Sequence, residues 1–287
     1  MKTGANLVVS GYLTVAILSS VACNKVDSLN SQDLSSADVE VLEEKRLLGN
    51  EIYLPIGTRW NFTNVEHSSV SFDLPAGYVF LMINVKTNES KLAKEGGGYS
   101  CTAGGSCTTF YNQDLGYGCL QSTCTGSCIG KKTKTNSDWL IEGVLLAEND
   151  LIDMHSPPNP ASLSAVGLKG FFKIPEVEKE IKRTYDIIYK HIPRPNFDTL
   201  DFAGKEENSK YVFAKTYLYG VQIGLVVPND PAIKTLMPNL QVLNLAEAPK
   251  NCTCSGGDVA GGCKLKKSGI FGYVAYYCTG CTTCTMN

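Results

Sequence analysis

The sequence predicts a β-rich α+β protein of antiparallel sheets, with one main helix and two small cysteine-rich modules. Short apolar runs rich in β-branched and aromatic residues alternate with Pro and Gly turns, a pattern typical of antiparallel strands. One segment has a long and clear helical period. The cysteines gather in two groups that lie far apart in the chain. The order of strands, helix and strands argues against a doubly wound parallel sheet.

Strands are predicted on both sides of the helix. The Pro55–Gly57 and Pro75–Gly77 turns bound the first set, in which Val70 and Phe72 alternate as on one buried face of a sheet. A later set has Gly220 and Gly224 as bends or bulges of a hairpin. The predicted strands are Ile52–Leu54, Trp60–Phe62, Ser69–Phe72, Tyr78–Ile83, Tyr211–Phe213 and Thr216–Val227. The segment Trp139–Leu146 fits a strand or a short helix, and its periodicity leaves both open.

The main helix is predicted over Ile174–Ile192. Pro175 suits the first helical position, and the acidic residues at 176 and 178 suit the positive end of the helix dipole. Pro193 is expected to end the helix, which places His191 in its last turn. One apolar face is predicted to carry Val177, Ile181, Tyr185, Ile188 and Ile192. A second, short amphipathic helix is predicted from the spacing of apolar residues in 39–47.

The N-terminus has the pattern of an export signal. Lys2 precedes the charge-free apolar stretch Leu7–Leu18, which is too short to span a membrane comfortably. Small residues, Ser19–Ala22, then lead to Cys23. This segment resembles the lipobox of bacterial lipoproteins, although Ser20 stands where Leu or Val is usual. The resemblance implies cleavage before Cys23, lipid on that cysteine and a membrane anchor in the cell envelope, at the outer membrane or cell surface.

Two other interpretations of the N-terminus stay open. An ordinary signal peptide could be cut near Ala22 and leave Cys23 as a structural thiol, or the segment could stay attached in a cytosolic protein. The expected organisation is a signal peptide (1–22), a polar tether and short helix (23–50), a β-rich segment (51–100), a first cysteine module (101–135), an α+β segment (136–250) and a second cysteine module (251–287).

The two cysteine groups resemble each other in sequence. The chain has twelve cysteines including Cys23. Each group begins with Cys-Thr, passes a glycine-rich turn to a second cysteine, crosses a spacer with Gly-Tyr, and ends with three cysteines and a Cys-Thr-Gly step. This pattern predicts an internal duplication of a unit of about 30 residues. The first group is Cys101, Cys107, Cys119, Cys124 and Cys128, and the second is Cys252, Cys254, Cys263, Cys278, Cys281 and Cys284.

Disulfide bonding is the first interpretation of these eleven cysteines, because an exported protein meets an oxidising compartment. An odd number leaves one thiol unpaired, and the spacing does not reveal the pairing. Cys252 could pair with the first module. The alternative is a metal site with a zinc ion or an iron–sulfur cluster, held by Cys254, Cys278, Cys281 and Cys284. A third interpretation is thiol redox chemistry at Cys278-x-x-Cys281. The leading interpretation includes no cofactor.

Composition and motifs favour a non-enzymatic role. The net charge of −2 gives no basic surplus for nucleic acid. No Gly-x-Ser-x-Gly or His-Glu-x-x-His motif occurs, and no catalytic residue is assigned. We therefore expect a membrane-anchored lipoprotein with a binding or envelope-structural role, whose partners are the membrane and either another envelope protein or a surface ligand. A metal- or cluster-binding lipoprotein in electron transfer or metal handling is the alternative, and a hydrolase is the third candidate.

Overall fold

A computed structural model describes most of the chain after residue 38, and its described residues fall within one compact unit. The described residues are 39–48, 52–63, 69–95, 97–102, 107–112, 116–121, 129–132, 138–147, 161–238, 240–250, 252–254, 263–270, 273–279 and 284–286. The predicted signal peptide, Cys23 and the polar tether lie outside these residues.

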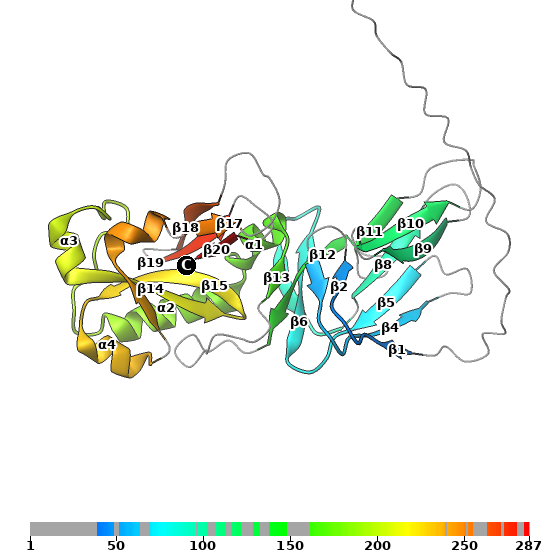
Figure 1. Ribbon diagram of the computed structural model, residues 1–287, viewed down its shortest axis with the longest axis horizontal. Helices are drawn as coiled ribbons and strands as arrows, with labels where there is room; N and C mark the ends of the chain where they lie inside the picture. The colour runs from blue at the N-terminus through cyan, green and yellow to red at the C-terminus, as the bar shows by residue number, and fades with distance from the viewer. Residues whose placement is uncertain are drawn as a thin grey trace, which may run out of the picture. The chain divides into compact units, whose positions relative to one another are not determined.

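The described residues form antiparallel sheets, which confirms the β-rich character expected from the sequence (Figure 1). The first sheet has the order β1-β4-β5-β8-β11, and β9 pairs with β10 beside it. A separate ladder joins β2 to β3. The bounds are β1 Glu40–Val41, β2 Arg46–Leu48, β3 Ile52–Leu54, β4 Arg59–Phe62, β5 Ser69–Asp73, β8 Gly97–Thr102, β9 Cys107–Asn112, β10 Gly116–Gln121 and β11 Ile129–Lys132.

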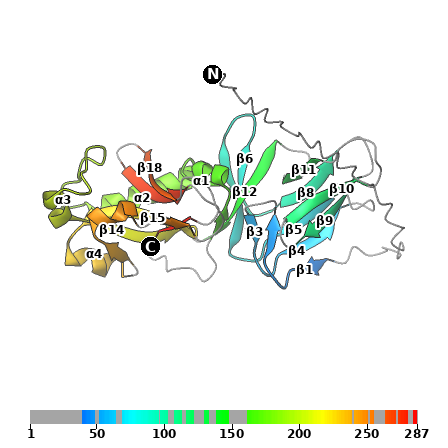
Figure 2. The same cartoon turned by 45° about the horizontal axis from the view of Figure 1, so that its top comes forward.

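A four-stranded sheet of the order β13-β12-β6-β7 follows (Figure 2). Its bounds are β6 Tyr78–Asn84, β7 Ser90–Ala93, β12 Trp139–Leu146 and β13 Ser162–Leu163. The segment that fitted either a strand or a helix is thus strand β12, which runs antiparallel to β6. A register shift between Ile141 and Gly143 marks a bulge in β12.

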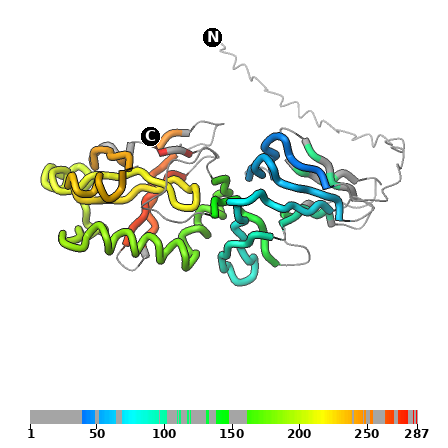
Figure 3. The backbone as a smooth tube through the Cα atoms, turned by 90° about the horizontal axis from the view of Figure 1, so that it is seen from below, coloured from blue at the N-terminus to red at the C-terminus, as the bar shows by residue number. Residues whose placement is uncertain are grey.

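The C-terminal part combines a five-stranded sheet, β16-β14-β15-β19-β18, with short helices and the ladder β17-β20. Helix α2 runs along this sheet (Figure 3). The helices are α1 Ala165–Phe171, α2 Pro175–Ile188, α3 Lys205–Lys210, α4 Pro231–Leu236 and the 3₁₀ turn η1 Leu245–Lys250. The strands are β14 Tyr211–Leu218, β15 Val221–Pro228, β16 Gln241–Leu243, β17 Cys252–Cys254, β18 Lys264–Ile270, β19 Tyr273–Thr279 and β20 Cys284–Met286.

Strands β6 and β12 separate two buried clusters of apolar side chains. Because neighbouring residues of a strand point to opposite faces, Val79 and Leu81 enter one cluster while Phe80 and Met82 enter the other. The first cluster also holds the apolar face of α2 and the inner residues of β14 and β15. The second holds the inner residues of β5 and β8. The β6–β12 pair is therefore buried on both faces, which explains its nearly continuous apolar sequence.

Two sequence predictions about helices are wrong. Residues 39–47 contain strands β1 and β2 and no helix, because Leu42 exchanges backbone hydrogen bonds with Thr58 and Gly57 at 2.9 and 2.8 Å. The main helix starts at Pro175 as predicted but ends at Ile188, before the expected end. His191 is consequently an exposed residue in the turn after the helix.

Candidate functional site: two disulfide-bonded modules

The first cysteine module belongs to the first sheet. Strand β11 pairs with β8 from Ile129 opposite Thr102, and β8 in turn pairs with β5. The middle strands, β9 and β10, form a hairpin of their own, in which Tyr111 lies opposite Tyr117. The module is therefore an extension of the larger sheet, and it helps to enclose the second buried cluster.

A disulfide joins Cys101 on β8 to Cys119 on β10, with the Cα atoms 5.6 Å apart. Cys101 is buried among aromatic side chains, and the Tyr117 ring packs 5.1 Å from the ring of Phe72. Burial raises the pKa of Tyr117, although a hydrogen bond from Arg46 opposes this shift. The bond thus connects the outer hairpin to the sheet through the interior of the protein.

A guanidinium group is placed between the aromatic residues at this module. The Arg46 Cζ atom lies 4.8 Å from the ring centre of Tyr111 and 5.4 Å from that of Trp60. Its Nη1 donates to the Tyr117 hydroxyl at 3.4 Å. Such cation–π contacts contribute about 0.5–1 kcal/mol each where water has access. They attach the segment after the tether to the first cysteine module.

The second cysteine module has a similar construction. Strands β18 and β19 form a hairpin that completes the C-terminal sheet, while β17 and β20 pair with each other. One disulfide joins Cys252 on β17 to Cys278 on β19, again with 5.6 Å between the Cα atoms. Another joins Cys263, directly before β18, to Cys284 on β20, with 5.7 Å between the Cα atoms. Cys252 therefore pairs within its own module.

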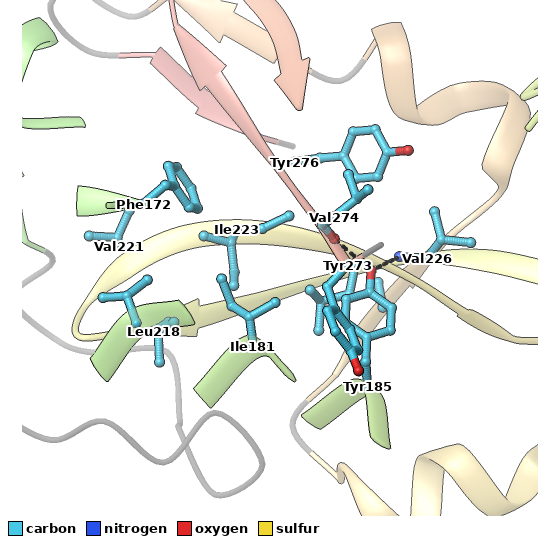
Figure 4. Close-up of a cluster of buried hydrophobic side chains, with 14 of the residues drawn as sticks. Phe172, Ile181, Tyr185, Leu218, Val221, Ile223, Val226, Tyr273, Val274 and Tyr276 are labelled. Atoms are coloured by element: carbon cyan, nitrogen blue, oxygen red, sulfur yellow. Dashed lines mark hydrogen bonds between the residues drawn. The ribbon is translucent and has the colours of Figure 1, made fainter. Parts of the chain in front are cut away.

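Helix α2 holds this hairpin through a buried tyrosine. Strands β15 and β19 share the register Gly224 opposite Tyr276, which would place Val226 opposite Val274. At that point the Tyr185 hydroxyl lies between the strands (Figure 4): it donates to the Val274 carbonyl at 2.6 Å and accepts from the Val226 N–H at 3.4 Å. The side chain thus replaces a direct bond between the two backbones. Burial raises the pKa of Tyr185.

An exposed ionic network surrounds the start of β19. The Asp186 carboxylate accepts from Lys182 at 2.6 Å, from Arg194 at 2.6 Å and from the Tyr273 hydroxyl at 3.0 Å. The hydrogen bond from Lys182 is the first cause of a lowered pKa of Asp186. The Arg194 Cζ atom also lies 4.6 Å from the ring centre of Tyr273. This network joins α2, the segment after it and the second cysteine module.

Two of the four cysteines assigned to a metal in the alternative interpretation are in disulfides. Cys278 is bonded to Cys252 and Cys284 to Cys263, so neither can supply a thiolate. Cys281 and the side chain of Cys254 lie outside the described residues. Among the residues that the structure describes, no group of three His, Cys, Asp or Glu side chains is arranged to hold a metal ion.

The other sequence-assigned cysteines fall partly outside the described residues. Cys124 and Cys128 are not described, and for Cys107 the backbone alone is described. Sequence reasoning placed Tyr185 on the buried face of the helix but did not predict that its hydroxyl bonds to the backbone of two strands. It also missed Asp186 and Arg194. The signal for Tyr185 was a polar tip within an otherwise apolar helix face, since a buried hydroxyl needs a hydrogen-bond partner.

Within the described part of the chain, no helix combines the length and apolar character needed to cross a membrane. No family model, curated protein or solved structure matches the chain.

Proposed function

We propose that this chain is an exported, lipid-anchored protein of the cell envelope with a non-enzymatic binding or structural role. The observation that carries the proposal is the set of disulfides Cys101–Cys119, Cys252–Cys278 and Cys263–Cys284. Such bonds persist in oxidising compartments and are rare where cytosolic thiols are kept reduced. Their presence in both modules agrees with the export signal expected from the first 22 residues.

The location of these bonds supports folding after export. Cys101 and Cys278 are both buried, at 8% exposure each, and their sulfurs pack among the apolar side chains of the two clusters. A protein with these bonds inside its cores needs an oxidant when the cores form. The lipid on Cys23 would then anchor the chain, with the polar residues 24–38 between the lipid and the folded body.

The internal bonding of buried polar groups supports a structural role over a catalytic one. The Glu142 carboxylate accepts from Ser164, and Glu180 is bonded to Arg183 at 2.6 and 2.9 Å. The buried hydroxyls of Tyr185 and Tyr189 are bonded to strand backbones. Catalytic groups must be presented to a substrate, whereas Ser164, Tyr185 and Tyr189 bond to other elements and the Glu180–Arg183 pair lies within α2.

Lipid labelling in the native host tests this proposal. Cells that express the full chain are fed radioactive palmitate, and the protein is isolated with its N-terminus determined. We expect labelled protein that begins at Cys23 and partitions with membranes, and loss of label in Cys23→Ser. The Ser20→Leu variant, which restores the usual lipobox residue, is a control that should keep the label. Unlabelled protein that retains residues 1–22 in the soluble fraction would overturn the proposal.

A further inference from the structure

The two cysteine modules have the same order of strand pairing. In the first, the second and third strands form a hairpin (β9–β10) while the fourth pairs with the first (β11–β8). In the second, β18–β19 and β20–β17 repeat this arrangement. All four pairings are antiparallel. Four strands can pair in several ways, so an identical order in two segments of similar sequence is a specific likeness.

The disulfides repeat as well. In each module one bond joins the first strand to the third: Cys101 to Cys119 and Cys252 to Cys278. This sets Cys119 and Cys278 as equivalent positions. The Cys-Thr-Gly steps in the sequence would instead align Cys124 with Cys278, whereas the strand order and the disulfides align Cys119 with Cys278.

We infer that the modules are two copies of one four-stranded unit and that the first copy contains a bond from Cys107 to Cys128. The equivalent bond in the second copy is Cys263–Cys284, which joins the start of the second strand to the start of the fourth. Cys107 is the first residue of β9, and Cys128 directly precedes β11 in the sequence. They are the cysteines of the first copy that match Cys263 and Cys284.

The registers place these positions at one end of each copy. In the second copy, Cys284 lies opposite Cys254 at the end of the first strand, while the second strand begins with Lys264 opposite Thr279 at the end of the third. In the first copy, β11 begins opposite the end of β8, and β9 begins opposite the end of β10. The starts of the second and fourth strands therefore lie at the same end of both copies.

The remaining cysteines follow by elimination. In the second copy, Cys254 and Cys281 are left after the two described bonds, and we infer that they pair with each other. Cys281 matches Cys124 of the first copy, because each lies between the third-strand cysteine and the fourth strand. The first copy has no second cysteine on its first strand, so no cysteine of that copy is left to pair with Cys124. With Cys23 set aside as the lipidated residue, Cys124 is the one cysteine of the remaining eleven that is left over.

Each of these bonds forms by thiol–disulfide exchange with an oxidant. For each bond, two thiols lose two protons and two electrons, and one disulfide of an exported thiol oxidant is reduced to a dithiol. The bonds Cys107–Cys128 and Cys254–Cys281 are inferred whether or not Cys23 carries lipid, whereas the unpaired thiol at Cys124 rests on the proposed lipid at Cys23. The two bonds are therefore tested separately from the anchor proposed above.

Disulfide mapping tests the inference on the full exported chain with Cys23→Ser, which removes that cysteine from the count. The protein is denatured without reductant, alkylated, digested with chymotrypsin and sequenced by tandem mass spectrometry. We expect Cys107 joined to Cys128, Cys254 joined to Cys281, and one alkylated thiol at Cys124. A bond from Cys107 to Cys124, or a bond between the two modules, would overturn the inference.

A thermal double-mutant cycle gives a second readout. Cys107→Ser and Cys128→Ser should lower the melting temperature by equal amounts, and the double variant should lose no more than either one. The matched control is Cys124→Ser, which should leave the melting temperature unchanged. Additive losses at 107 and 128, or a loss in the Cys124 variant as large as theirs, would contradict the pairing.

Discussion

At the residue scale, single side chains join segments that the backbone leaves apart. Tyr185 lies in the last turn of α2 and Tyr189 directly follows the helix, and their hydroxyls reach the backbone of the sheet at Val274 and Val226. The half-buried Asp186 beside them connects α2 to β19 through Tyr273. The second cysteine module is therefore held by polar contacts as well as by its disulfides.

Removal of one hydroxyl tests this role. Tyr185→Phe leaves the Val274 carbonyl and the Val226 N–H without their partner between the strands. Because unpaired buried polar groups are costly, we expect the free energy of unfolding to fall by about 1–3 kcal/mol, measured by urea denaturation. Tyr211→Phe is the control: that residue is half-buried, and no hydrogen bond of its hydroxyl is found among the described residues. Equal stability of the two variants would show that the bridge contributes nothing.

At the element scale, close packing of strands depends on a missing side chain. Gly224 on β15 forms the register with Tyr276 on β19. A Cβ atom at this position would lie 2.0 Å from the ring of Phe213, which is fully buried. The sequence predicts a bend or bulge at Gly224, whereas β14 and β15 pair without a shift from Tyr211 to Leu218. The glycine makes room for a ring.

This explanation predicts that substitution by alanine has very different effects on stability at two glycines of the same sheet. Gly224→Ala should destabilise the protein by about 1–3 kcal/mol, because the Phe213 ring must leave its position. Gly269→Ala on β18 is the matched control, since a Cβ there meets no atom within 4 Å. We expect its free energy of unfolding to stay close to that of the parent protein. Chemical denaturation measures both, and a Gly224 variant as stable as the control would contradict the packing argument.

The sequence pattern was sufficient to predict those elements whose structure is decided by neighbouring residues in the chain. The runs at β5 and β6 and the start of α2 at Pro175 follow from alternation, apolar composition and proline geometry. It failed where distant partners decide the structure. The apolar spacing in 39–47 imitates a helix, but the backbone of Leu42 bonds to the turn after β3. Helix α2 ends early although Ile192 continues the period.

The same limit applies to the cysteines. Spacing grouped them correctly and suggested disulfides, but the pairing depends on which strands are neighbours. The bond Cys101–Cys119 spans 18 residues and Cys252–Cys278 spans 26, so equal spacing could not reveal that they are equivalent. Strands β8 and β11 of the first module and β18 and β19 of the second belong to the two five-stranded sheets, because a short glycine-rich segment gains stability by packing on a core.

At the scale of the whole molecule, the two buried clusters pack against opposite faces of the β6–β12 pair. Alternate residues of β6 enter different clusters, and β12 contributes Leu145 to one and Ile141 and Val144 to the other. Loss of either cluster would expose one face of this pair to water. We therefore expect the described body to unfold in one cooperative transition, and the disulfides of each module to stabilise both clusters together.

Removal of one disulfide from each module tests this coupling. By the chain-entropy argument, loops of 18 and 26 residues both correspond to about 3 kcal/mol. For a protein of this size the melting temperature should then fall by roughly 6–12 °C. We expect the paired variants Cys101→Ser/Cys119→Ser and Cys252→Ser/Cys278→Ser to show similar falls and one calorimetric transition each. We expect this because the β6–β12 pair couples the unfolding of the two clusters. If a variant instead showed two separate transitions, one of them at the melting temperature of the parent protein, each cluster would unfold alone.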